Sequence, residues 1–94
     1  MVIGVLTLNL YLEDAFSLKD KRHIVKSLIE RIRNRFNASV AETDLNDVWK
    51  NAVISVVCVS NDSSHIDSML SNIVEFAQND GRFFIENYST EKIF

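Results

Sequence analysis

Residues 2–12 read VIGVLTLNLYL, and their side chains alternate between two kinds with a period of two. From residue 5 onward one side of this run is all leucine, and the other is mixed: Leu6, Leu8, Leu10 and Leu12 stand against Val5, Thr7, Asn9 and Tyr11. A period of two over this length is typical of a half-buried β-strand. The sequence therefore predicts a first strand whose leucine side faces the core.

Two stretches further along the chain have helical spacing instead. The first begins at Ser17-Leu18-Lys19-Asp20, which fits a capping box, and carries its apolar residues on one stripe: Ile24, Val25, Leu28, Ile29, Ile32 and Phe36. The second follows the polar residues 60–64 and has a similar stripe: Ile66, Met69, Leu70, Ile73, Val74 and Ala77. We expect the first helix to run to about Phe36, and the second to end near Gly81 as its C′ residue.

Three further strands complete the pattern. Residues 38–43 form a short candidate, residues 44–47 have turn chemistry, residues 49–59 alternate, and residues 82–94 form a last strand. The order β-α-β-β-α-β predicts one α+β domain over residues 1–94 with a ferredoxin-like fold. We expect a four-stranded antiparallel sheet in the order 4-1-3-2 with both helices on one face.

Composition bounds the class of protein. The chain has 94 residues, 47% hydrophobic and 24% charged, which suits a single globular domain. Cys58 is the one cysteine, so no internal disulfide forms, and with no signal peptide or apolar span in view we expect a cytoplasmic protein. With Gly4 and Gly81 as the two glycines, neither a P-loop nor a dinucleotide-binding loop can be built.

Charge is distributed unevenly along the chain. Seven of the ten Lys and Arg residues lie between Lys19 and Arg35, so this segment carries +5 and the remainder −8 within a net charge of −3. Such asymmetry points to a charged partner more than the net charge does.

Four short motifs carry a resemblance to a known family. They are SLKDKR at 17–22, NASVA at 37–41, DVW at 47–49 and SND at 60–62. With them the chain resembles the YlxP-like family of small bacterial proteins over almost its whole length. The resemblance implies a ferredoxin-like fold and no established activity. Members are often encoded beside translation-factor and ribosome-maturation genes, which implies an RNA or ribosome context.

The first predicted helix carries the candidate RNA-binding residues. Lys19, Arg22, Lys26 and Arg33 fall within about 60° of one another at 100° per residue, along a ridge about 21 Å long. Such a ridge can meet several phosphates, or it can be a solvated flank in which Glu30 pairs with Lys26 or Arg33.

Lys21 is the fifth candidate RNA-binding residue, and the sequence is compatible with two different roles for it. With Lys19, Arg22 and the free N–H groups of the first turn it could form an anion site. Because it projects toward the apolar side of the helix, it could instead reach a carboxylate such as Glu13 or Asp14.

The outer side of the predicted sheet is a second candidate interface. Val5, Tyr11, Val53 and Val57 would leave an apolar area there if nothing covered it. A homodimer or a partner protein would resolve this, although scattered surface valines are also ordinary in strands. The outer side of the third strand carries no aromatic residue, whereas RNA-recognition domains stack bases on aromatic residues of their two central strands.

No residue pattern predicts catalysis, a metal or a cofactor. His23 and His65 lack further ligands at zinc spacing, Glu42, Asp44 and Asp47 lack a calcium-loop pattern, and Cys58 is expected in the core. Trp49 is expected to anchor the hairpin. We therefore expect a protein that is not an enzyme, and three functions stay open: a ribosome- or RNA-associated factor, a homodimeric interaction module, or a small-molecule-binding regulatory domain. Small-molecule-binding regulatory domains of this topology usually have a glycine in the ligand loop, and this chain lacks that glycine.

Overall fold

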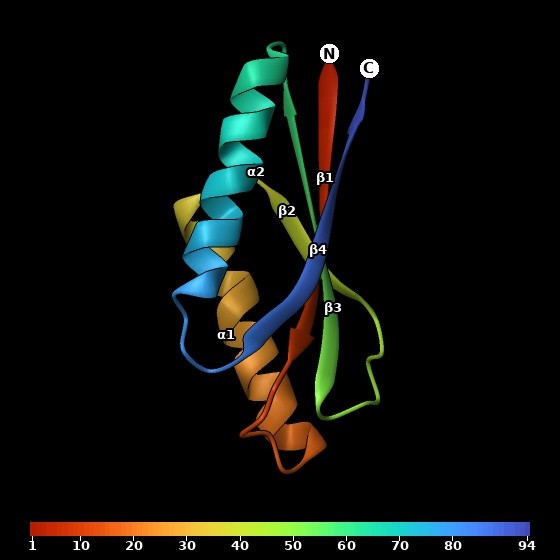
Figure 1. Cartoon of the computed structure of the whole chain (residues 1–94), viewed down its shortest axis with the longest axis vertical. Helices are drawn as coiled ribbons and strands as arrows, with labels where there is room; N and C mark the ends of the chain where they lie inside the picture. Colours follow the sequence, from red (N-terminus) through yellow and green to blue (C-terminus); the bar gives the residue numbers. More distant parts are fainter.

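The computed structural model describes residues 1–94 and has the predicted element order. The elements are β1 (Val2–Tyr11), α1 (Leu18–Arg35), β2 (Ser39–Asp44), β3 (Asn51–Ser60), α2 (Ser63–Gln78) and β4 (Phe84–Ile93). The strands form one antiparallel sheet in the order β2-β3-β1-β4, which is the predicted order read from its other edge. Figure 1 shows both helices on one face of this sheet, so the ferredoxin-like prediction is confirmed.

The core lies between the helices and the inner face of the two central strands. Leu6, Leu8, Leu10 and Leu12 of the leucine side are at most 1% exposed. Opposite them on β3, Ile54, Val56 and Cys58 alternate inward in the same way, and β1 and β3 pair along their full lengths. From α1 the stripe supplies Val25, Leu28 and Ile32, and from α2 it supplies residues such as Ile66 and Ile73.

Both helices begin at side-chain caps. Ser17 Oγ accepts a hydrogen bond from the Asp20 N–H at 3.1 Å, and the Asp20 carboxylate accepts one from the Phe16 N–H at 3.1 Å. This is the reciprocal arrangement of a capping box, displaced by one residue. Asp62 caps α2 by accepting from the Ser64 N–H at 2.9 Å.

The end of α2 differs slightly from the prediction. The helix ends at Gln78 with Asn79 as its cap, and Gly81, with φ of 88°, lies two residues further on in the turn to β4. Gly81 supplies the left-handed backbone that only glycine adopts readily, but it does so after the helix has ended.

Gly4 allows α2 to approach the sheet closely. A Cβ atom at this position would lie 2.5 Å from Cγ2 of Ile66, and 3.3 Å from the Cys58 sulfur. Because Cγ2 is bonded directly to Cβ of Ile66, and χ1 of a β-branched residue in a helix has one strongly preferred rotamer, this atom moves little, so a side chain at residue 4 would push α2 away from β1.

The two helices are also joined through polar contacts at the end of α2. The Asp80 carboxylate is 1% exposed and pairs with Arg82 at 2.6 Å and with Arg31 at 3.0 Å. Burial alone would raise the pKa of Asp80, but the hydrogen bonds and charge of Arg82, with the charge of Arg31, outweigh it and lower that pKa. Phe36 and Phe76 pack edge to face beside this cluster, 5.7 Å apart.

The molecule is elongated, with extents of 42 × 21 × 19 Å, and its two ends differ. Figure 1 shows both chain termini together at one end, beside the start of α2. The opposite end is formed by the start of α1 and the connections of residues 12–17 and 45–50.

Candidate nucleic-acid interface on the first helix

The basic ridge is defined as Lys19, Arg22, Lys26 and Arg33. The last three lie on the flank of α1 that faces the edge strand β2, whereas Lys19 lines a separate hollow at the start of α1 with Asp14, Asp20 and His23. Arg22, Lys26 and Arg33 line one shallow groove of about 460 Å³ between the two elements. Its floor is apolar and comes from both sides: Val25 and Ile29 of α1, and Val40 and Ala41 of β2. The helix spacing that suggested the ridge therefore brings three of its four residues to one groove.

The charges of the ridge are not neutralised within the protein. Among the ten Lys and Arg residues, four pair with carboxylates: Lys21, Arg31, Arg82 and Lys92. Arg35 lies over the rings of Phe36 and Phe76, and Lys50 lies over Phe16. The four cations that have neither an ion pair nor an aromatic contact are the four of the basic ridge. Glu30 lines the same groove but pairs with none of them.

Arg33 has a fixed position within the ridge. Its guanidinium donates a hydrogen bond to the Val40 carbonyl of β2 at 2.7 Å. A carbonyl does not cancel the charge, and the guanidinium has further N–H donors that can face a phosphate. Arg33 is thus oriented by the sheet edge while it remains charged.

Lys21 does not belong to this surface, and its inclusion among the RNA-binding residues was wrong. Its side chain is completely buried, and Nζ lies 2.7 Å from Oε2 of Glu42. Nζ also donates to the carbonyls of Leu45 at 2.5 Å and Asn46 at 3.4 Å. Glu42 Oε2 accepts no well-aligned hydrogen bond, so the contact between these two side chains is chiefly coulombic.

Glu42, not Glu13 or Asp14, is therefore the carboxylate that Lys21 meets. A buried lysine requires such compensation, because an unpaired ammonium in the core would be far less stable than one in water. The first turn of α1 is also less suited to an anion, since Ser17 Oγ occupies the Asp20 N–H and the exposed Asp20 carboxylate places a negative charge at the same helix end.

The four residues proposed for a dimer interface do not form one cluster on the outer face of the sheet. Val5 lies opposite Val57, and this pair is extended by three apolar neighbours toward the chain termini: Ile3, Val59 and Ile93. Tyr11 lies at the other end of β1, opposite Asn51 and Phe84. Val53 lies between them, opposite Asn9, whose side chain donates to Asn87 at 2.6 Å.

Three other expectations have clear outcomes. Cys58 is buried on the inner face of β3, as predicted, and this burial raises the pKa of its thiol. Trp49 is 47% exposed in the connection before β3, so the expectation that it anchors the hairpin was wrong. Asp44 is exposed, whereas Glu42 faces inward to Lys21, so these two carboxylates do not converge.

The opposite flank of α1 carries contacts that were not predicted from the sequence. There Arg31 and Arg35 lie 5.4 and 5.3 Å from the centre of the Phe76 ring. Their spacing of four residues next to Phe36 was the available signal, since cations four apart on a helix share a face. This flank is used to hold α1 against α2.

The structure has no helix that is both long and apolar enough to cross a membrane. No three His, Cys, Asp or Glu side chains are grouped so that they could hold a metal ion.

Fold and surface together define a small ferredoxin-like α+β domain with a basic first helix. The chain belongs to the family described as "Protein of unknown function (DUF503)", whose family model matches residues 3–90. It is similar to "Uncharacterized protein YlxP" of Bacillus subtilis (strain 168), with 29% identity over 75 residues that cover 80% of this chain and 82% of that protein. The resemblance inferred from the short motifs is thereby confirmed.

Proposed function

We propose that this protein is a non-enzymatic cytoplasmic factor that docks on structured RNA, or on the ribosome, through the basic ridge. The observation that supports this proposal is the pairing pattern of the cations. Every Lys and Arg residue outside the ridge is engaged by a carboxylate or an aromatic ring, and every one within it is free of both.

An unpaired row of cations suits a polyanion with regularly spaced charges. Each Lys or Arg that faces a phosphate releases condensed counterions, which gives affinity without sequence specificity. The apolar floor of the groove beside the ridge can accept the edge of a sugar or a base. The acidic remainder of the chain would repel RNA bound elsewhere, so the charge distribution favours one orientation.

Co-sedimentation with ribosomal subunits at low and high salt tests this proposal. The wild-type protein should sediment with subunits at about 50 mM salt and be released at several hundred millimolar. Arg22→Ala/Lys26→Ala should abolish sedimentation at low salt. The control Lys50→Ala/Lys92→Ala removes the same amount of charge away from the ridge and should behave like wild type. Absence of wild-type binding at low salt, or equal loss in both double variants, would contradict the proposal.

A homodimer through the outer sheet face is the second candidate function. It is supported by the Val5–Val57 pair with its apolar neighbours, because Val57, Val59 and Ile93 are 37, 60 and 46% exposed and no helix covers them. A second copy applied to this end of the face would bury them. This function needs no nucleic acid, and it is compatible with the ridge remaining free.

A further inference from the structure

The end of the molecule farthest from the chain termini exposes a cluster of large apolar side chains. We call it the loop patch and define it as Phe16, Leu45, Val48 and Trp49. Their exposed fractions are 69, 40, 39 and 47%, respectively. Three of the four lie within five consecutive residues of one connection, which is unusual for a surface loop.

Hydrogen bonds from the buried Lys21 and within the connection itself hold the loop patch in place. The buried Lys21 ammonium donates to the carbonyls of Leu45 and Asn46, and the Val48 N–H donates to the Leu45 carbonyl at 3.0 Å. Leu45 has φ of 57°, a left-handed conformation that costs a leucine about 1 kcal/mol or more. An apolar loop fixed in a strained conformation loses little further freedom when it binds a partner.

The second connection is tied to the first through Lys50. Its ammonium donates to the Glu13 carbonyl at 2.5 Å and lies 4.3 Å from the centre of the Phe16 ring. The Leu12 N–H donates in turn to the Lys50 carbonyl at 2.8 Å. The two connections therefore form one surface, on which an aromatic ring already binds an ammonium group.

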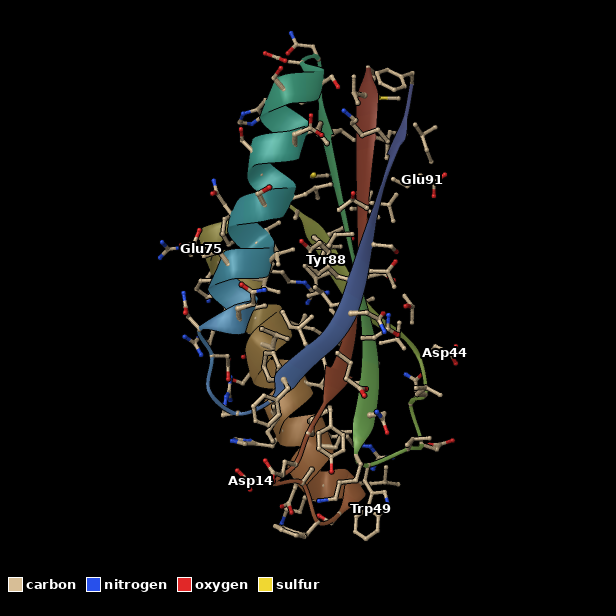
Figure 2. The ribbon with its side chains drawn as sticks, in the orientation of Figure 1. Asp14, Asp44, Trp49, Glu75, Tyr88 and Glu91 are labelled. Atoms are coloured by element: carbon tan, nitrogen blue, oxygen red, sulfur yellow. The ribbon has the colours of Figure 1, made fainter.

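Carboxylates surround this apolar surface. Glu13, Asp14 and Asp47 belong to the same two connections, and Asp44 is the last residue of β2 directly before one of them; all are exposed, and none forms an ion pair. Figure 2 shows Asp14 and Trp49 at this end of the molecule, whereas Asp44 lies nearer its middle, where β2 ends. Free carboxylates beside exposed aromatic rings repel phosphates and attract cations.

We infer that the loop patch is a docking surface for a lysine- or arginine-rich segment of a protein partner that also carries an apolar residue. The cationic side chains of the segment would lie over Trp49, whose ring has no cation over it, and face the carboxylates, while the apolar residue contacts Leu45 and Val48. Charge complementarity favours such a segment over nucleic acid. The inference does not rest on the basic ridge, which has the opposite charge and of which Arg22, Lys26 and Arg33 lie in the groove beside β2.

Trp49 is the only tryptophan of the chain, so its fluorescence reports directly on the patch. The probe is a labelled peptide of about twelve residues that alternates arginine with leucine, and the control peptide has glutamate in place of arginine. The arginine peptide should bind at micromolar concentration and shift the Trp49 emission to shorter wavelength. Trp49→Ala should weaken binding, measured by peptide anisotropy, by about tenfold or more, since buried tryptophans dominate such interfaces. Trp49→Phe, which keeps a ring, should retain most of the affinity.

Matched variants distinguish a specific surface from general attraction to an acidic protein. Asp14→Asn/Asp47→Asn should weaken binding severalfold. Glu75→Gln/Glu91→Gln and Tyr88→Ala, which change exposed carboxylates and an exposed aromatic residue away from the patch, should change it less than twofold (Figure 2). Equal effects in both sets, peptide binding without a change in Trp49 emission, or quenching of Trp49 by single-stranded RNA in preference to the peptide would overturn the inference. Arg22→Ala/Lys26→Ala should leave peptide binding unchanged, so failure of the ridge proposal and failure of this one are separable.

Discussion

The Nζ atom of Lys21 lies 2.7 Å from Oε2 of Glu42, beneath the connection that leads from β2 to β3. This pair joins the start of α1 to the inner face of an edge strand, and the same ammonium holds two backbone carbonyls of the connection. We expect Lys21→Met to reduce the free energy of unfolding by about 3 kcal/mol, because it leaves Glu42 facing the core without a counter-charge. Urea denaturation measures this change.

The double variant Lys21→Met/Glu42→Leu provides the control for this prediction. Removing both charges leaves no unpaired ion, so the double variant should be more stable than Lys21→Met alone. A stability of Lys21→Met within about 0.5 kcal/mol of wild type would contradict the structural role of the pair.

Gly4→Ala should destabilise the protein by about 1–3 kcal/mol, since the added methyl group would overlap Cγ2 of Ile66. Ile66→Leu removes that branch, so Gly4→Ala/Ile66→Leu should recover part of the loss. Gly81→Ala is the comparison: no atom lies within 4 Å of the added group, and its cost of about 1 kcal/mol comes from the positive φ alone. Thermal unfolding followed by circular dichroism compares the three, and full tolerance of alanine at residue 4 would mean that α2 lies farther from β1.

The Asp80 cluster should make stability depend on acid pH. The pKa of Asp80 is lower in the folded protein, so its contribution is present above the unfolded pKa and is lost as the pH falls below about 4. Asp80→Asn should reduce stability at neutral pH and make the curve of stability against pH shallower in the acid range. Urea midpoints at pH 7 and pH 3 measure the difference, and an unchanged difference between the two pH values would show that other carboxylates determine acid unfolding.

Binding of the protein to folded RNA should become weaker as salt increases, with a slope set by the number of ridge contacts. Each of Arg22→Ala and Lys26→Ala should reduce the slope of log affinity against log salt by about one unit for every RNA tested. Neither substitution should change stability by more than about 0.5 kcal/mol, because both side chains are exposed. A filter-binding titration gives the slope, and Lys92→Ala, which removes a charge paired with Asp67, serves as the comparison.

Val57→Lys should make a dimeric protein monomeric without unfolding it. An ammonium at this position would be buried opposite Val5 in a sheet-to-sheet contact, whereas in the monomer it faces water. Ser71→Lys, on the exposed side of α2, adds the same charge away from the sheet and should leave the dimer intact. Light scattering at micromolar and higher concentrations decides the matter, and a wild-type monomer throughout this range would rule out the interface.

The sequence predicts this fold well because each periodic pattern of apolar residues continues over many residues. The alternation of residues 2–12 places four leucines in the core, and the stripe of α1 places Val25, Leu28 and Ile32 there. The ends of the elements were predicted less closely than their existence. The predicted third strand began at Trp49, but regular pairing starts at Asn51. The shift of register between Asn9 and Leu10 against β4 has no signature in the sequence, since a bulge depends on how two strands meet.

The candidate sites were predicted in part. Helical spacing brought Arg22, Lys26 and Arg33 to one groove, because spacing on a helix fixes direction. The same geometry pointed Lys21 inward but could not choose its partner. Glu42 shares the inner side of β2 with Val40, so the alternation of that short strand held the missing information. The exposure of Trp49 follows from the path of a connection, and neither the strand period of two nor the helix period of 3.6 residues describes a connection.

The hydrogen bond from Arg33 to the Val40 carbonyl also affects how copies of this chain can aggregate. β2 is an outermost strand, and an outermost strand of a sheet is the place where a foreign strand can join and start a fibre. The guanidinium of Arg33 occupies a carbonyl that an incoming strand would need, and it brings a positive charge to that place. Any growth of the sheet from this side would first have to displace a charged side chain, so a single helix residue opposes the addition of a strand at this edge.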